Sequence, residues 1–132
     1  KNFDIILSPA MGGIIIGYEI GRLLNKQTIF SESVDGEFKL RRDFSISKNQ
    51  NVLIIEDVIT TGKSSLECSK LVLEKEANVV GFACIIDRSN GKSDIKKKIV
   101  SQVELNIPTY KKENLPKDLS KIKAEKPGSR NL

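Results

Sequence analysis

The sequence predicts an α/β fold in which an open, mostly parallel sheet is flanked by helices. Short apolar runs alternate with segments of helical periodicity, which is the pattern of such sheets. The runs span residues 3–7, 51–55 and 79–86. A loop of unusual composition follows each run, at 9–13, 56–65 and 87–91. Because ligands of open α/β sheets bind beyond the carboxyl ends of the strands, we expect one site built from these loops.

The amino-terminal part predicts a strand, a helix and a second strand. Residues 3–7 form a nearly continuous apolar run, typical of a strand buried on both faces. From Ile14 to Leu24 apolar residues recur at helical spacing, and Asn25 is a plausible helix end. Residues 27–30 predict the second strand. A polar segment with a turn signal at Asp35-Gly36 comes next.

The second half repeats this order and then weakens. Asn51 to Ile55 is the clearest buried strand, and a helix is expected over 64–76 with an inner stripe of Cys68, Leu71 and Val72. Residues 79–86 predict another strand, and 99–107 are compatible with a last one. The remainder, 108–132, is rich in lysine, and no second domain is expected within residues 1–132.

Composition and charge exclude several classes of protein. Of the 132 residues, 22 are basic and 17 acidic, and the excess lies in residues 92–132, with 11 basic and 5 acidic side chains. These lysines are not interleaved with aromatic residues, so a solvated surface is favoured over a nucleic-acid partner. Histidine is absent and the two cysteines lack CxxC spacing, which argues against zinc and favours free thiols in a reducing compartment. Without an apolar run near 20 residues, we expect a cytoplasmic protein with no membrane partner.

The loop from Glu56 to Ser65 carries the strongest chemical signal. Two carboxylates at a strand end precede hydroxyl residues that surround Gly62 at a helix start, an arrangement suited to binding phosphate. A ligand with sugar hydroxyls and phosphates fits both parts, and a divalent metal is compatible with them. Thr61 taken alone is more simply a helix cap. A P-loop is excluded because Asp57 stands where its first glycine is required, and residues 11–13 lack the dinucleotide spacing.

These residues also carry a family resemblance. The stretch 52–65, VLIIEDVITTGKSS, closely resembles the phosphoribosyl-pyrophosphate signature of type I phosphoribosyltransferases, and its Val-Ile-Thr-Thr-Gly form is similar to that of the orotate branch. Three other stretches agree. Residues 8–13 resemble the pyrophosphate loop, 86–88 the strand end that contacts orotate, and 126–130 the ending of one bacterial branch.

The resemblance implies roles for individual residues. Glu56 and Asp57 would hold the ribose hydroxyls, and Thr60 and Arg88 would contact orotate, whose carboxylate suits a guanidinium fork. Asp57 would be catalytic, and Mg²⁺ would be bound mainly through the pyrophosphate substrate rather than by a protein metal site. The loop residues implied are Val58, Ile59, Thr60, Thr61, Gly62, Lys63 and Ser64 for the 5-phosphate and Ala10, Met11, Gly12 and Gly13 for the pyrophosphate.

The implied activity is transfer of the 5-phosphoribosyl group from phosphoribosyl pyrophosphate to orotate, which gives orotidine 5-phosphate and pyrophosphate in pyrimidine biosynthesis. The implied assembly is a homodimer. Two alternatives stay open. A purine phosphoribosyltransferase is disfavoured by Arg88 and the Thr-Thr form of the loop, and a non-catalytic regulator with this fold is kept open by the missing loop histidine.

The sequence departs from the family in three places. A mobile loop over Ser31 to Arg42 would supply catalytic cations, but Glu32-Ser33 stand where other members carry Arg-Lys. Gly12 replaces a lysine common in the pyrophosphate loop. The expected substitutes are Lys39, Arg41 and Arg42, although an exposed hairpin with solvated charges accounts for them equally well. The segment that normally precedes the first strand and covers orotate is absent, so we expect a fragment of a longer chain.

Overall fold

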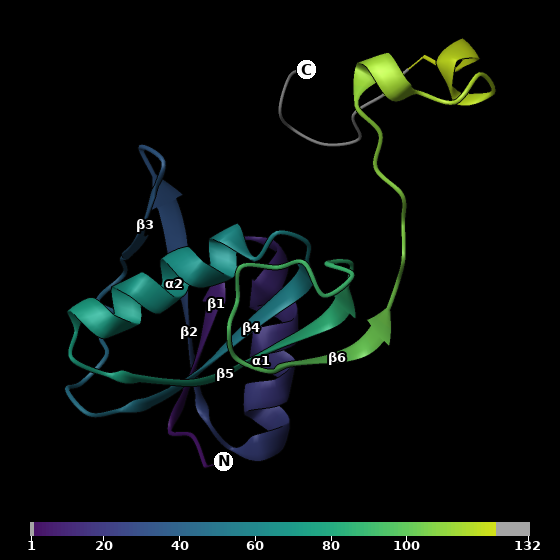
Figure 1. The fold of residues 1–132 in the computed structure, drawn as a ribbon. Helices are drawn as coiled ribbons and strands as arrows, with labels where there is room; N and C mark the ends of the chain where they lie inside the picture. Colours follow the sequence, from purple (N-terminus) through teal and green to yellow (C-terminus); the bar gives the residue numbers. More distant parts are fainter. Residues whose placement is uncertain (1, 124–132) are drawn as a thin grey trace.

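The computed structural model describes residues 2–123, which form one sheet with a helix on each face (Figure 1). The six strands lie in the order β3-β2-β1-β4-β5-β6, and only β3 is antiparallel to its neighbour. The predicted open, mostly parallel α/β sheet is thereby confirmed. The elements are β1 (Ile5–Pro9), α1 (Gly12–Leu24), β2 (Gln27–Val34), β3 (Glu37–Leu40), β4 (Asn51–Ile59), α2 (Lys63–Glu74), β5 (Asn78–Asp87), β6 (Ile99–Glu104) and the 3-10 turns η1 (Lys112–Asn114) and η2 (Leu119–Lys121).

The core lies between the central strands and α2. Strand β1 is buried along its whole length, as its continuous apolar run predicts for a central parallel strand. Helix α2 turns Cys68 and Val72 inward, both fully buried, and Leu71 is half-buried, so the predicted inner stripe is confirmed. The Ser31 hydroxyl of β2 lies 3.2 Å from the Cys68 sulfur and fixes the helix over the sheet.

Helix α1 packs on the opposite face through glycines. Its buried residues are Gly13, Gly17 and Gly21, while Ile15 and Tyr18 are mostly exposed. A Cβ at Gly13 would lie 2.8 Å from the Ile55 carbonyl oxygen, so the helix comes closer to the sheet than any side chain would allow. The apolar periodicity therefore predicts the helix correctly, but most of those apolar residues do not form its buried face.

Two strands are longer than the sequence predicts. Strand β4 continues through Ile59, so Glu56 and Asp57 belong to the strand and not to the loop after it. Strand β2 continues to Val34 and turns back into β3 through Asp35 and Gly36, whose φ angles are 54° and 83°. Two successive positive φ values define the tight turn that suits the twist of a hairpin. The segment expected as a loop over 31–42 is a β-hairpin.

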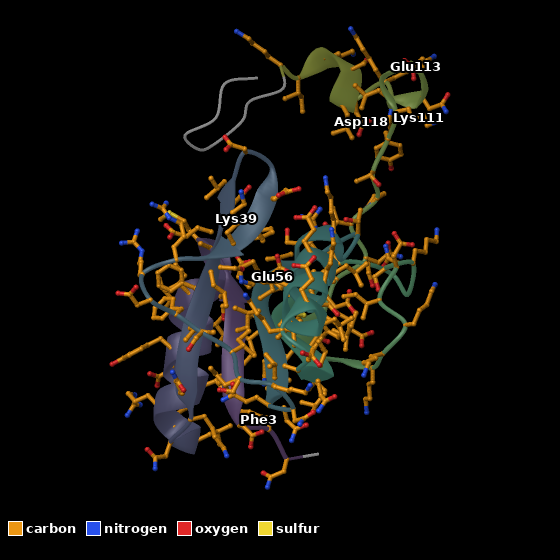
Figure 2. All side chains as sticks on the ribbon, turned by 90° about the vertical axis from the view of Figure 1, so that its left-hand side faces the viewer. Phe3, Lys39, Glu56, Lys111, Glu113 and Asp118 are labelled. Carbon is orange, nitrogen blue, oxygen red and sulfur yellow. The ribbon has the colours of Figure 1, made fainter. Side chains whose placement is uncertain are left out.

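The chain after β6 leaves the body of the domain. Residues 105–123 run as an extended segment to η1 and η2, which lie apart from the sheet (Figure 1). Lys111, Glu113 and Asp118 mark this segment in Figure 2. The resemblance noted at 126–130 lies outside the described residues. Among residues 2–123, no helix is long and apolar enough to span a bilayer.

Candidate functional site

The three unusual loops meet at one edge of the sheet, as expected from the parallel order of β1, β4 and β5. Backbone hydrogen bonds tie two of these loops to neighbouring segments. The Ala10 N–H donates to the Ser31 carbonyl of β2 over 2.8 Å, and the Arg88 N–H donates to the Ile59 carbonyl over 2.8 Å. The 87–91 loop is therefore held against the 56–65 loop, and the 9–13 loop meets the end of β4 through the close approach of Gly12 to Asp57.

The turn between β4 and α2 forms a cradle for an anion. Gly62 is the N-cap of α2 with φ 81°, a left-handed conformation that glycine adopts without strain, and it has no side chain that could occupy the first-turn amides. The first amides of a helix lack intrahelical partners and attract negative charge. A hollow of about 40 Å³ lies against these groups, lined by Glu56, Val58, Thr60, Thr61, Gly62, Lys63 and Ser64.

Thr61 precedes the N-cap Gly62, and its hydroxyl accepts the Lys63 N–H of the first turn of α2 over 3.3 Å. Thr61 therefore satisfies one amide at the helix start, as its interpretation as a capping residue predicts, although from the position before the N-cap. The side chains of Thr60 and Thr61 are exposed at the rim of the cradle, where hydroxyl groups can donate to phosphate oxygens.

Ile95 supports the cradle from behind. A Cβ at Gly62 would lie 2.9 Å from Ile95, whose side chain is 7% exposed. The Asp94 N–H donates to the Thr61 carbonyl over 3.2 Å and ties the same segment to the loop. The segment between β5 and β6 thus fixes the shape of the phosphate cradle, a role that the local sequence does not signal.

Glu56 and Asp57 point to opposite faces of the sheet, because successive side chains of a strand alternate. Glu56 faces α2 and accepts a hydrogen bond from the Ser65 hydroxyl over 2.5 Å. Burial raises the pKa of Glu56, and the neighbouring charge of Asp57 acts in the same direction, while the Ser65 hydrogen bond opposes them. The structure therefore places Glu56 beneath the first turn of α2, next to the cradle.

Asp57 faces the start of α1. Its carboxylate lies directly against the Cα of Gly12, so that any Cβ at residue 12 would overlap it. The Val58 N–H donates to Asp57 Oδ1 over 2.8 Å and fixes the rotamer. Gly12 stands where the family resemblance places a lysine. The contact gives the physical reason, because the Asp57 carboxylate occupies the space that a side chain at residue 12 would need.

The loop of residues 10–13, which is predicted to bind pyrophosphate, connects β1 to α1. Ala10 is half-buried and Met11, the N-cap of α1, is 82% exposed. The N-cap of α1 makes no side-chain hydrogen bond, so first-turn amides of α1 lie beside Asp57, as those of α2 lie at the cradle. Two helix starts of this kind can accept a ligand that carries two separate phosphate groups.

Arg88 follows β5 at the same edge. It is half-buried, and its Nε atom is buried without a hydrogen-bond partner in the structure. The alternative in which Arg88 pairs with Asp87 is not found: Asp87 Oδ1 accepts the Ser89 N–H over 2.7 Å, and Arg88 takes part in no ion pair among residues 2–123. A buried donor without a partner is costly, which makes Arg88 a ready partner for an acceptor on a ligand.

The other predicted residues divide between backbone and rim. Ile59 is a core side chain, 1% exposed, and can serve a ligand only through its main chain. The Lys63 side chain is 82% exposed and lies 3.8 Å from Glu67 on the outside of α2. Lys39 lies on β3, and Arg41 and Arg42 follow it. Their side chains are 50%, 59% and 62% exposed. Figure 2 shows Lys39 on the hairpin that projects past the edge carrying Glu56.

A hollow larger than the one at the cradle lies elsewhere. It measures about 550 Å³ and is bordered by Phe3, Leu53, Val80, Gly81, Phe82, Ala83, Lys97, Lys98 and Val100. Helix α1 packs on β1, β2 and β4, which leaves this part of β5 and β6 without a helix. The hollow contains none of the loops at the carboxyl edge, so its size does not make it the candidate site.

The fold brings two helix starts and a carboxylate together at the carboxyl edge of a parallel sheet, an arrangement that can accept a phosphorylated ligand. Residues 1–120 match the phosphoribosyl transferase domain, and the chain belongs to this family. It is 46% identical over 129 residues to an orotate phosphoribosyltransferase of Parvibaculum lavamentivorans, and 47% identical over 125 residues to one of Rhizorhabdus wittichii. These alignments cover 98% and 95% of this chain but only 66% and 64% of the relatives.

Solved structures agree on the fold. An adenine phosphoribosyltransferase of Thermoanaerobacter pseudethanolicus superposes with a TM-score of 0.70 at 19% identity, over 80% of this chain and 71% of that one. An orotate phosphoribosyltransferase of Aeropyrum pernix superposes with a TM-score of 0.66 at 18% identity, over 79% of this chain and 62% of that one. At such identities the likeness establishes the type I phosphoribosyltransferase fold and not the base that is bound.

Proposed function

We propose that the protein to which this chain belongs is an orotate phosphoribosyltransferase. It would transfer the 5-phosphoribosyl group of phosphoribosyl pyrophosphate to orotate and release pyrophosphate, a step of pyrimidine biosynthesis. The observation that carries the proposal is the joint position of Asp57, the glycine-capped start of α2 and the unpaired Arg88 Nε at one edge of the sheet. The relatives from Parvibaculum and Rhizorhabdus, which are named for this activity, support the choice of base.

The ligand would bind across the loops in three parts. The 5-phosphate would occupy the cradle of residues 58–64, and the ribose hydroxyls would meet Asp57 and Glu56. The pyrophosphate would lie on residues 10–13 at the start of α1. Orotate would then reach Thr60 and Arg88, where a guanidinium group can donate two parallel hydrogen bonds to its carboxylate.

Catalysis would consist of positioning and charge stabilisation. The bond from the anomeric carbon to the pyrophosphate oxygen would break, a bond from that carbon to a ring nitrogen of orotate would form, and the proton lost from the nitrogen would pass to the departing pyrophosphate or to solvent. Asp57 would fix the ribose ring through its hydroxyl groups while the free amides at both helix starts hold the two phosphate ends. Lys39, Arg41 and Arg42 would supply positive charge near the departing pyrophosphate.

Mg²⁺ fits this site only together with the substrate. Among residues 2–123 no group of three or more acidic, histidine or cysteine side chains could hold a metal ion. Asp57, beside the pyrophosphate loop, offers one hard carboxylate, and Mg²⁺ in such sites is bound by one or two carboxylates plus phosphate oxygens. When bound, the ion would neutralise charge on the pyrophosphate.

Assembly and location are part of the same proposal. The resemblance implies a homodimer, and the start and outer face of α1 expose apolar side chains, among them Met11, Ile15 and Tyr18, which a second copy could cover. Both cysteines are free and buried, and burial raises the pKa of Cys68 to about 12 and that of Cys84 to about 11. Such inert thiols fit a reducing compartment, and we place the protein in the cytoplasm.

The test is a substrate panel with the natural full-length chain. Loss of orotate absorbance would be followed with phosphoribosyl pyrophosphate and Mg²⁺, and adenine and hypoxanthine would be offered separately. We expect turnover with orotate alone. Turnover with a purine base in place of orotate would establish the purine alternative, and binding of phosphoribosyl pyrophosphate without turnover of any base would establish the regulator.

A further inference from the structure

Glu32 is an acidic residue in a position where positive charge is expected. It lies on β2, directly opposite Lys39 of β3 in the hairpin register. Thr28, two positions before Phe30 and four before Glu32, donates to the Gly17 carbonyl of α1 over 3.3 Å. Because alternate residues of a strand share a face, Glu32 lies on the face of the sheet that carries α1 and Asp57.

Glu32 forms ion pairs with two arginines that follow β3. Arg42 Nη2 donates to Glu32 Oε1 over 3.1 Å, and Arg41 Nη1 lies 3.9 Å from Oε2. The Glu32 side chain is 22% exposed, against 59% and 62% for the two arginines, and Oε2 is shielded without a hydrogen-bond partner. The carboxylate is therefore the fixed member of the cluster, and the longer cationic side chains are placed by it.

This cluster adjoins the pyrophosphate loop. Pro9 pairs with Ser31 in the register of β1 and β2, and the Ala10 N–H donates to the Ser31 carbonyl. Glu32 is thus one residue from the strand position that anchors the loop of residues 10–13. With Lys39 opposite Glu32 and with Arg41 and Arg42, the cluster keeps a formal charge of +2 next to the strand position that anchors the loop leading into α1.

We propose that Glu32 is a positioning residue, which holds Arg41 and Arg42 at the edge of the pyrophosphate loop so that they meet the pyrophosphate group of the substrate. The inference rests on the proposed function for the identity of the ligand. Glu32 contributes through the arginines and does not contact the ligand. If Glu32 acted only through its charge, removing the carboxylate would strengthen pyrophosphate binding, because the positive charge near the loop would rise.

The experiment compares Glu32→Gln with Glu32→Asp in the full-length natural chain. Magnesium pyrophosphate is titrated calorimetrically, and KM values for phosphoribosyl pyrophosphate and orotate are measured separately. We expect Glu32→Gln to weaken pyrophosphate binding and raise the phosphoribosyl pyrophosphate KM about tenfold, the typical effect of losing a charged hydrogen bond. The orotate KM should stay unchanged, and Glu32→Asp should retain most of the affinity.

Two controls isolate the positioning role. Glu37→Gln makes the same charge change on the same hairpin, where Glu37 is 76% exposed and lies 4.0 Å from Lys39, and should leave pyrophosphate affinity unchanged. In an Arg41→Gln/Arg42→Gln background, Glu32→Gln should have no further effect, because the residues it positions are gone.

Unchanged or tighter pyrophosphate binding by Glu32→Gln would overturn the proposal. So would a loss of pyrophosphate affinity in the Arg41→Gln/Arg42→Gln background that equals the loss caused by Glu32→Gln in the wild-type background. The titration needs no orotate, so its outcome is independent of the base specificity. A wild-type protein that binds pyrophosphate but consumes no orotate would refute the proposed function while the role of Glu32 is still decided by the titration.

Discussion

The carboxylate of Asp57 lies directly against the Cα of Gly12, so the position of Asp57 depends on the absence of a side chain at residue 12. The contact joins the end of β4 to the start of α1, two segments 45 positions apart in the chain. It brings the carboxylate near the end of β4 to the loop of residues 10–13, which is the proposed pyrophosphate site. The ribose and pyrophosphate parts of one substrate can therefore be bound by adjacent groups.

Gly12→Ala is expected to impair turnover by displacing Asp57. The added methyl group would occupy the space of the carboxylate, and misplacing a catalytic group by about 1 Å can cost on the order of a hundredfold in rate. The measurement is kcat/KM for phosphoribosyl pyrophosphate. Gly81→Ala is the matched control, because its Cβ would make an ordinary contact at 3.9 Å with Leu53. Equal rates for both variants would show that Asp57 is not held by this contact.

Gly62→Ala is expected to lose more stability than Gly36→Ala. Both glycines have φ near +80°, so both substitutions carry a similar backbone cost of about 1–2 kcal/mol. Only Gly62 would also push a Cβ against Ile95, whereas nothing lies within 4 Å at Gly36. Urea unfolding compares the two variants, and phosphate binding should weaken in Gly62→Ala alone. Equal losses of stability in the two variants would show that Ile95 does not support the cradle.

Arg88→Ala is expected to raise the KM for orotate and to change that for phosphoribosyl pyrophosphate little. The unpaired Nε indicates a guanidinium group awaiting an acceptor, and a charged hydrogen bond is worth roughly tenfold or more in affinity. Steady-state kinetics with each substrate varied in turn provides the measurement. An effect confined to phosphoribosyl pyrophosphate would contradict the assignment of Arg88 to the base.

Glu56→Gln is expected to alter the pH dependence of stability. Burial raises the pKa of Glu56 above its ordinary 4.5, so its neutral form is favoured in the folded state. That contribution is fully present below the unfolded pKa and is lost as the pH rises through the folded pKa, with a slope of at most about 1.4 kcal/mol per pH unit. Unfolding free energies measured from acid to neutral pH should therefore shift in favour of the glutamine variant as the pH rises. A constant difference between the two proteins would exclude this.

The fold was predictable from sequence where local pattern and tertiary structure agree. The buried strands at 51–55 and 79–86 and the inner stripe of α2 follow directly from apolar runs and spacing. The packing face of α1 does not, because Gly13, Gly17 and Gly21 become buried only when a strand lies beneath them. Hydrophobic periodicity gives glycine no weight, so close backbone packing escapes it.

The candidate site divides in the same way. The string from Glu56 to Ser64 and the loop at 10–13 could be recognised because contiguous residues carry the chemistry. Ile95 and Glu32 could not, since each acts on residues distant in sequence: Ile95 on Gly62, and Glu32 on Arg41 and Arg42. The opposite orientations of Glu56 and Asp57 follow from strand alternation, but their partners Ser65 and Gly12 required the structure.

The most direct test of the account is the rate of orotidine 5-phosphate formation by the Asp57→Asn variant of the full-length protein. Asparagine keeps the size of the side chain and can still accept the Val58 N–H, so the fold should be retained. Asp4→Asn is the matched control, since Asp4 accepts the Asn51 N–H at the opposite end of β4. We predict a fall in kcat of about a hundredfold for Asp57→Asn and none for Asp4→Asn. An unchanged rate in a folded Asp57→Asn protein would contradict the placement of the ribose at this edge of the sheet.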